Sequence, residues 1–272
     1  MRPLGLLGSL SIDLIDGGPP QPGGPPFHAA RALRLLSRRA VVVTRCGASE
    51  RQQLLPSLAA LGLPVTCLDG ASTSTFAFRY EGDVRHFEVV SAGDPWTVEE
   101  ARELRRGALA EIEWLHVGPV LSTDFPADTL AELAARRRLS YDGHGLVRRS
   151  EPGPLRLDTD FDHSLLEHVS ILKLAEEEAI AAAGSLEPEA LGALGPSEVL
   201  VTFGSEGALV VADGKAERVH AHPVLDVDPT GSGDAFAAGY LAARSAGVTP
   251  VAAARQATTL VGTILARRRR GR

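Results

Sequence analysis

Short apolar runs alternate with segments that carry one apolar face along most of this chain. Apolar and β-branched runs, typical of buried strands, occupy residues 4–10, 40–44, 65–68, 114–117, 139–141, 171–173 and 199–202. Helical periodicity is found over residues 27–36, 50–61, 98–110, 127–137, 164–168, 176–183, 233–245 and 250–266. The Gly- and Pro-rich stretch 17–26 predicts a loop. Because strands and helices alternate, the pattern predicts an α/β fold with a mostly parallel central sheet flanked by helices.

Residues 73–90 depart from this alternation of strands and helices. Aromatic and β-branched residues, among them Phe76, Phe78 and Val89, alternate with polar ones on both sides of a Gly-Asp turn at residues 81–83. This pattern predicts a β-hairpin with one solvated face. No linker-like break follows residue 30, so we expect one α/β domain over residues 1–272 that carries a small β appendage.

Composition narrows the class of protein further. The 272 residues are 44% hydrophobic and carry a net charge of −6, which suits a folded core and argues against a nucleic-acid partner. The two cysteines, Cys46 and Cys67, lack partners at metal-ligand spacing, so we expect a reducing, cytoplasmic location. No apolar stretch is long enough to span a bilayer, and we expect no membrane partner. The Arg-rich tail 267–272 is predicted to be a solvated terminus.

The segment 228–234, Asp-Pro-Thr-Gly-Ser-Gly-Asp, carries the strongest indication of chemistry. Its small residues Gly231, Ser232 and Gly233 precede a predicted helix, where free backbone N–H groups and the helix dipole favour an anion such as a phosphoryl group. Asp234 follows in the first turn, where a carboxylate can accept a proton from an attacking hydroxyl. From residue types alone, a tight turn with an acidic first-turn residue is an equal alternative.

Residues 227–239 resemble the C-terminal signature of PfkB (ribokinase-like) carbohydrate kinases, D-[TC]-x-G-[AS]-G-D-x-F-x-x-G. The resemblance implies a ribokinase-like fold with a β lid, and phosphoryl transfer from ATP with Mg²⁺. In the family the Asp deprotonates the acceptor hydroxyl, and the glycine-rich amides stabilise the moving phosphate. The resemblance therefore implies a base role for Asp234 and an anion hole at Gly231, Ser232 and Gly233.

Similar segments elsewhere imply an acceptor site. Residues 8–13 resemble the family's first strand, whose terminal acid, here Asp13, binds substrate hydroxyls. Residues 23–30 resemble its substrate loop, with Gly23 and Gly24, but His28 replaces the usual Asn. The lid would comprise residues of about 10–20 and 73–91, and its closure would exclude water. Family lids sometimes dimerise, so a homodimer formed through the lid is one expectation.

The segment 141–148 bears on the substrate class. It is similar to the D-x-Q-G-x-x-R pattern of the inositol-kinase-like branch, with His144 in place of Gln. The resemblance implies that Asp142, His144 and Arg148 bind a small sugar or cyclitol, and that the Arg148 guanidinium also holds the transferring phosphate.

Two further segments resemble the family's nucleotide site. Residues 172–178 are similar to K-x-N-x-x-E, which implies that Lys173 contacts nucleotide and that Glu178 organises Mg²⁺ largely through water, although Ala175 replaces the Asn. Residues 201–208 resemble a T-x-G-x-x-G turn. The nucleotide-binding residues implied there are Thr202, Gly204, Ser205, Glu206 and Gly207.

Three questions stay open at this point. Asp228 and Thr230 occupy positions of a monovalent-cation loop in the family, but the final helix runs directly into the Arg-rich tail, so K⁺ activation is undecided. A nucleoside kinase would share every catalytic residue. A non-catalytic ligand-binding or regulatory protein of the same fold is the third alternative, motivated by His28 and Ala175.

Overall fold

The computed structural model describes residues 2–81, 84–225 and 227–270. Its main sheet has nine strands in the order β14-β13-β12-β11-β9-β8-β1-β4-β5. These strands are β1 (Leu4–Ser9), β4 (Ala40–Gly47), β5 (Val65–Gly70), β8 (Trp114–Val117), β9 (Arg138–Asp142), β11 (Ile171–Ala175), β12 (Glu198–Thr202), β13 (Gly207–Ala212) and β14 (Lys215–His220). The strands from β5 to β12 pair in parallel, and β13 and β14 add an antiparallel edge. The predicted α/β class is confirmed.

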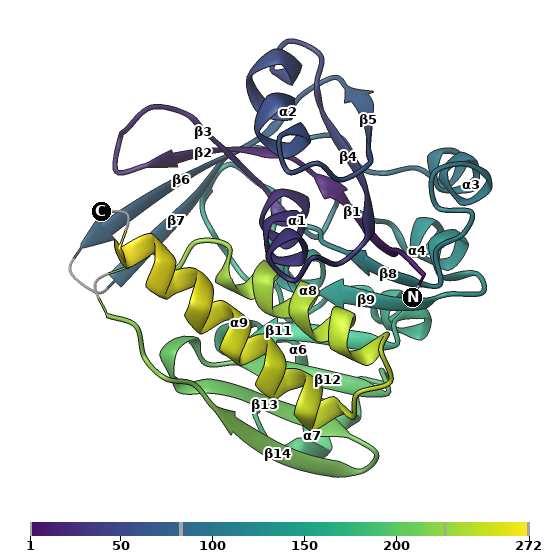
Figure 1. The fold of residues 1–272 in the computed structure, drawn as a ribbon, viewed down its shortest axis with the longest axis vertical. Helices are drawn as coiled ribbons and strands as arrows, with labels where there is room; N and C mark the ends of the chain where they lie inside the picture. Colours follow the sequence, from purple (N-terminus) through teal and green to yellow (C-terminus); the bar gives the residue numbers. More distant parts are fainter. Residues whose placement is uncertain (1, 82–83, 226, 271–272) are drawn as a thin grey trace.

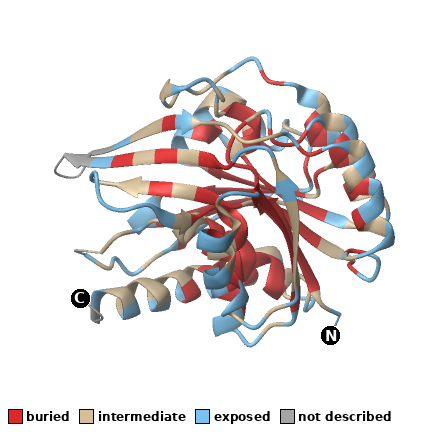
Figure 2. Ribbon diagram, turned by 90° about the horizontal axis from the view of Figure 1, so that it is seen from above, coloured by how far each residue is buried: buried red, intermediate tan, exposed pale blue. Residues whose placement is uncertain are grey.

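Helices cover both faces of this sheet (Figure 1). They are α1 (Pro25–Leu35), α2 (Arg51–Ala59), α3 (Val98–Arg106), α4 (Ala127–Ala134), α5 (His144–Val147), α6 (Glu176–Ala183), α7 (Pro188–Gly192), α8 (Ser232–Arg244) and α9 (Pro250–Arg270). Successive residues of a strand point to opposite faces of the sheet: Leu6 packs in the core with α1, α8 and α9, whereas Leu7 packs with α3 and α4. Strands buried on both faces need continuous apolar runs, which explains the sequence pattern (Figure 2).

A second sheet of five strands, in the order β10-β7-β6-β2-β3, projects beside the first. It consists of β2 (Ser11–Ile15), β3 (Gln21–Gly23), β6 (Ser74–Glu81), β7 (Val84–Ser91) and β10 (Gly153–Pro154). The predicted hairpin is present as β6 and β7, while residues 82 and 83 of its predicted turn lie outside the described residues. Phe76, Phe78 and Val89 face inward and pack on Val120 and Leu121. Pairing of two such sheets in a homodimer stays a prediction.

The structure corrects two expectations from the sequence. The loop predicted at residues 17–26 is wrong in its second half, where β3 forms and α1 begins at Pro25. Proline suits the first turn of a helix because its missing N–H would have no intrahelical partner. The Arg-rich tail is not simply solvated, because α9 continues to Arg270 and the Arg268 side chain is hydrogen-bonded to backbone carbonyls. Among the described residues, no helix is both long and apolar enough to cross a membrane.

Candidate active site

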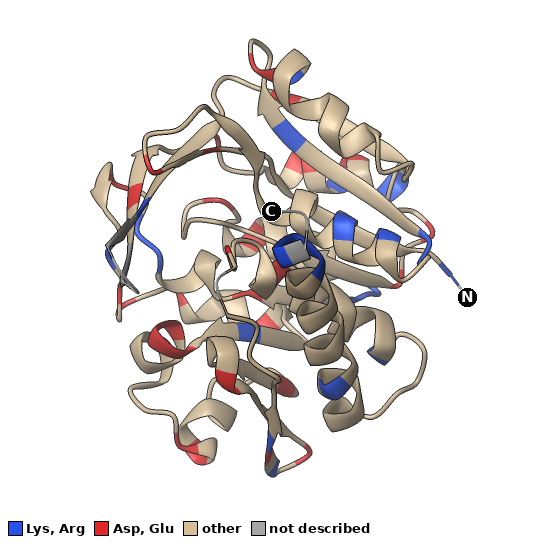
Figure 3. Ribbon diagram, turned by 60° about the vertical axis from the view of Figure 1, so that its left-hand side comes forward, with Lys and Arg blue, Asp and Glu red and all other residues tan. Residues whose placement is uncertain are grey.

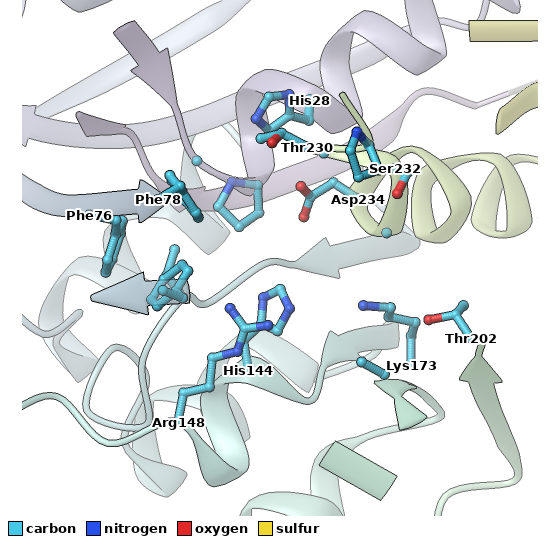
Figure 4. Close-up of a pocket in the computed structure, with 18 of the residues that line it drawn as sticks. His28, Phe76, Phe78, His144, Arg148, Lys173, Thr202, Thr230, Ser232 and Asp234 are labelled. Atoms are coloured by element: carbon cyan, nitrogen blue, oxygen red, sulfur yellow. The ribbon is translucent and has the colours of Figure 1, made fainter. Parts of the chain in front are cut away.

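A cavity of about 360 Å³ lies at the carboxyl ends of the parallel strands, under the second sheet. This is where open α/β sheets place their ligands. Residues from the predicted site that line the cavity are Asp13, Gly24, His28, His144, Arg148, Lys173, Thr202, Gly204, Gly231, Ser232, Gly233 and Asp234. Segments far apart in the sequence therefore meet around one space (Figure 4).

The first turn of α8 forms one wall of this cavity. Gly231 precedes the helix with φ +75°, and a Cβ at that position would overlap the His28 ring. A Cβ on Gly233 would lie 2.9 Å from Lys173 Nζ, so a side chain there would meet the ammonium group. The backbone N–H groups of a first helical turn have no intrahelical acceptor, and glycine leaves them uncovered. Here the Ser232 N–H donates to the Pro229 carbonyl at 2.9 Å, so the N–H groups of Gly231 and Gly233 are the ones open to a ligand. The wall can therefore receive an anion.

Asp234 projects from this turn into the cavity, across from His144, Arg148 and Lys173 (Figure 4). The residue is 8% exposed, and within the described chain its buried Oδ1 has no hydrogen-bond partner. A buried carboxylate oxygen is costly to leave unpaired, so it is available to a ligand hydroxyl. Burial lowers the pKa of the neighbouring His28 even though the Asp234 charge opposes this, so the His28 ring is neutral at pH 7.

A network of charged side chains supports the opposite wall. Arg148 donates to Glu178 Oε1 from Nε at 2.9 Å, and its Nη2 lies 2.8 Å from the same oxygen. Lys173 Nζ lies 3.2 Å from Asp142 Oδ2. His144 Nε2 lies 3.4 Å from both Asp142 Oδ1 and Glu178 Oε1. Two carboxylates thus face two permanent cations, with an imidazole between them.

The protonation states in this network follow from burial and charge. Burial alone would raise the pKa of Asp142 and Glu178, but the positive charges around them, first that of protonated His144 and then those of Lys173 and Arg148, hold both pKa values below the usual range. Burial would lower the pKa of Lys173, but the two carboxylates raise it. Burial and the Arg148 charge lower the pKa of His144. Both ion pairs are therefore charged at pH 7.

The network does not fit direct metal binding by Glu178. Asp142, His144 and Glu178 offer three ligand atoms within 4.8 Å of one another, the spacing of a metal site. However, Oε1 of Glu178 accepts from Arg148 and Oε2 accepts from the Ala175 N–H at 2.8 Å. A metal ion would have to displace the guanidinium. The exposed Glu176 and Glu177 line the cavity instead and could meet a hydrated Mg²⁺ through its water molecules.

The end of the cavity under the second sheet combines a carboxylate with an apolar wall. Ser11 donates to Asp13 Oδ1 at 2.7 Å, and Gly23 leaves room for the Asp13 carboxylate, which a Cβ would overlap. Phe76, Phe78 and Phe87 from the second sheet line the same space. Such a surface suits a small ligand that has hydroxyl groups on one side and C–H groups on the other.

A second cavity of about 410 Å³ lies beyond the first turn of α8. It shares Thr202, Gly204, Ser232 and Gly233 with the first cavity. The remaining lining includes Ser205 and Gly207 and is otherwise largely apolar, with Val224, Leu225, Val227, Val261 and Leu265. The two spaces therefore meet at the glycine-rich turn.

Several predicted site residues lie outside the first cavity. Gly23, Asp142 and Glu178 stand behind its walls, Ser205 and Gly207 line the second cavity, and Glu206 lines neither, with its carboxylate 3.9 Å from Arg218. Sequence reasoning missed Ser11, the second-cavity residues 221–225 and 227, and Arg268. Ser11 had a signal, because it lies two residues before Asp13 on one strand face. The other two depend on contacts between distant segments.

Comparisons with known proteins agree with the family resemblance. Residues 20–269 match the family described as pfkB family carbohydrate kinase. Ribokinase from Bacillus subtilis (strain 168) is 27% identical over 269 residues, covering 91% of this chain and 87% of that protein. ATP-dependent 6-phosphofructokinase isozyme 2 from Mycobacterium tuberculosis (strain ATCC 25618 / H37Rv) is 27% identical over 245 residues, 83% of this chain and 68% of that protein.

Solved structures agree with the fold. A pyrophosphate-dependent kinase in the ribokinase family, complexed with a pyrophosphate analog and myo-inositol, superposes with a TM-score of 0.82 at 24% identity, covering 97% of this chain and 95% of that one. Arabidopsis thaliana ribokinase, complexed with ribose and ATP, superposes with a TM-score of 0.74 at 19% identity, covering 97% and 93%. The predicted ribokinase-like fold is confirmed.

Proposed function

Because the chain belongs to the pfkB family of carbohydrate kinases, we propose that it transfers the γ-phosphoryl group of ATP to a hydroxyl of a small sugar or cyclitol. Enzymes of this family are phosphotransferases with an alcohol group as acceptor. The observation that carries the proposal is the Asp234 carboxylate, which lies in the first turn of α8, lines the cavity and has a buried oxygen, Oδ1, without a hydrogen-bond partner in the described chain.

The reaction needs a base and a site for the moving charge. The acceptor O–H bond breaks as its proton passes to Asp234, while the acceptor oxygen forms a bond to the γ-phosphorus. The bond from that phosphorus to the β-phosphate oxygen breaks, and ADP leaves. The backbone N–H groups of Gly231 and Gly233 and the Arg148 guanidinium stabilise the charge on the phosphoryl oxygens, and the Ser232 N–H, which donates to the Pro229 carbonyl at 2.9 Å, would have to leave that bond to join them. Glu178 contributes by holding Arg148 in place.

The acceptor would bind between Asp13 and the phenylalanines of the lid. An ionised carboxylate accepts two hydrogen bonds from a vicinal diol, and Ser11 fixes its orientation. Neutral His28 and His144 offer further donors or acceptors to hydroxyl groups. The apolar rings exclude water, which would otherwise compete for the phosphoryl group. The pattern at residues 141–148 and a solved neighbour that binds myo-inositol favour a cyclitol over other acceptors.

The second cavity supports ATP as the phosphoryl donor. Its apolar lining adjoins the glycine-rich turn, so an adenine base could lie there while its phosphates reach the anion hole. Mg²⁺ would arrive bound to these phosphates. Inorganic pyrophosphate is a second candidate donor, because solved neighbours with TM-scores of 0.82 and 0.81 are described as pyrophosphate-dependent.

A panel of donors against acceptors tests these assignments. ATP and pyrophosphate would each be combined with cyclitols, pentoses, hexoses and nucleosides, and product formation followed by ³¹P NMR. We expect turnover with ATP and a cyclitol or sugar. Turnover with nucleosides alone would favour a nucleoside kinase. ATP binding without turnover on any acceptor would favour a ligand-binding protein.

The substitution Asp234→Asn tests the base directly. It removes the proton acceptor but keeps the side-chain shape, so ATP binding should stay within about twofold while turnover falls by about 10²- to 10⁴-fold. Calorimetric binding of ATP and initial-rate kinetics would measure the two effects. Near-normal turnover would refute the role of Asp234.

A further inference from the structure

The last helix reaches the glycine-rich turn through one side chain. Arg268, near the end of α9, donates from Nη1 to the carbonyl oxygens of Asp228 at 3.0 Å and Thr230 at 2.7 Å. Arg267, Arg268 and Arg269 lie in the last turns of α9. This end of the helix lies beside the start of α8 (Figures 1 and 3). Arg268 is the half-buried one, whereas the side chains of Arg267 and Arg269 are exposed. A single cation therefore holds two carbonyl groups of the segment that precedes the anion hole.

The contact with Thr230 fixes an amide on the other side of the chain. The peptide between Thr230 and Gly231 is trans, so its C=O and N–H point in opposite directions. When the carbonyl points to Arg268, the Gly231 N–H points away from Arg268, and Gly231 lines the first cavity as well as the basic one that contains Arg268. Thr230 N–H in turn donates to Asp228 Oδ1 at 2.9 Å, which ties the segment together.

The position is unfavourable for a cation unless the carbonyls offset the cost. Burial and the nearby charge of Arg31 lower the pKa of Arg268, and only Asp228 opposes them appreciably. A third cavity, behind the glycine-rich turn, is lined by Arg268 together with the basic residues Arg31, Arg34 and Arg267. An arginine placed among like charges gains most from donating to carbonyl oxygens, as this one does.

We propose that Arg268 is a positioning residue that acts as a built-in monovalent cation. Its guanidinium holds the carbonyls of Asp228 and Thr230 and thereby aims the Gly231 N–H at the transferring phosphoryl group. The inference rests on the proposed phosphotransfer at this site. It makes turnover independent of added monovalent cations, because carbonyl oxygens that could bind K⁺ already have a cation.

Three variants test this role: Arg268→Ala, Arg268→Lys and, as a matched control, Arg269→Ala on the exposed face of the same turn. Kinetics would be measured with ATP and the best acceptor in tetramethylammonium buffer, with and without K⁺ or low guanidinium. We expect less than twofold cation dependence for the wild type and the control. Arg268→Ala should lose about 10- to 100-fold in kcat with little change in acceptor KM. This loss is smaller than the about 10²- to 10³-fold loss that follows the removal of an anion-hole donor, because Arg268 acts only through such a donor. K⁺, guanidinium or the Lys variant should restore part of it.

A second measurement does not depend on turnover. Hydrogen exchange of a peptide spanning residues 228–240 should be faster in Arg268→Ala than in Arg269→Ala, and K⁺ or guanidinium should slow it again. If the wild type has no kinase activity but the variants differ in exchange as expected, the proposed function is refuted and the cation role of Arg268 stands. Arg268→Ala with normal kcat in cation-free buffer, or with a loss that no cation restores, would overturn the inference.

Discussion

The buried pair Arg148–Glu178 allows a quantitative test of how the site is held together. The Glu178 side chain is 0% exposed and that of Arg148 14%, and two guanidinium nitrogens lie within 2.9 Å of one carboxylate oxygen. Replacing Glu178 by Gln removes the charge but keeps an oxygen for the Ala175 N–H. Removing one partner of a buried pair leaves an uncompensated charge, so we expect the free energy of unfolding to fall by about 3–5 kcal/mol.

A double-mutant cycle separates the pair from its surroundings. Arg148→Met should also destabilise the fold, but the double variant should lose less than the sum of the two, with a coupling of about 1–3 kcal/mol. The exposed pair Arg255–Glu217 is a matched control, since its N–O distance of 2.6 Å is similar while its side chains are 64% and 51% exposed. Its coupling should be about 0–1 kcal/mol.

Urea unfolding at pH 7.5 would supply the four free energies of each cycle. Kinetics of Glu178→Gln would add a functional comparison: kcat should fall because Arg148 loses its anchor, while the Mg²⁺ concentration for half-maximal rate stays within about twofold. A buried-pair coupling no larger than that of the surface pair would refute the structural reasoning. A large rise in the Mg²⁺ requirement would show instead that Glu178 serves the metal.

Two further predictions concern a glycine and the buried histidines. Gly231→Ala should lower the free energy of unfolding by about 1–2 kcal/mol because alanine is strained in the left-handed backbone conformation. It should lower stability and kcat further because the new Cβ overlaps His28. Gly214→Ala, with φ +69° and nothing within 4 Å of a Cβ, isolates the backbone cost, and equal urea midpoints for the two variants would contradict the overlap. Burial lowers the pKa of three histidines, His28, His116 and His144. As pH falls below 6.5 the unfolded chain binds these protons first, so stability should fall with pH, by at most about 1.4 kcal/mol for each histidine at pH 5.5. Urea unfolding at pH 7.5 and 5.5 measures this, and His116→Asn should show a smaller dependence than the wild type.

The sequence predicted the parts of the fold that depend on local periodicity. The runs around Leu6 and Val42 predict strands buried on both faces, and both strands lie in the main sheet between helices. The loop prediction failed at Pro25, because Gly and Pro content does not distinguish a loop from the first turn of a helix. The edge strands β13 and β14 were not predicted. For β14 the reason is that Lys215–His220 is mostly polar and exposed, with no apolar face, whereas β13 is a buried apolar run that the periodicity could have indicated.

The candidate site also has residues whose positions follow from a local motif and residues whose positions depend on tertiary packing. Residues within one motif, such as Gly231 and Asp234, share a local geometry that the sequence specifies, and the structure places them on one wall. The Mg²⁺ role of Glu178, largely through water, stays a prediction from its motif, whereas its ion pair with Arg148, thirty positions away, was not predicted. Arg268 gave no signal at all, because its contacts with Asp228 and Thr230 exist only after α9 has packed beside α8. Contacts between distant segments arise from tertiary packing, so they cannot be predicted from local sequence patterns.

The shared wall between the two cavities has a consequence for the order of events in catalysis. Because Ser232 and Gly233 border both spaces, donor and acceptor can occupy them together, on opposite sides of one turn. On the proposed function, a phosphoryl group would then cross in a single displacement within a ternary complex, without a phosphorylated enzyme. Such a reaction inverts the configuration at phosphorus and gives intersecting rather than parallel reciprocal plots, so the layout of two neighbouring pockets already implies the kinetic scheme.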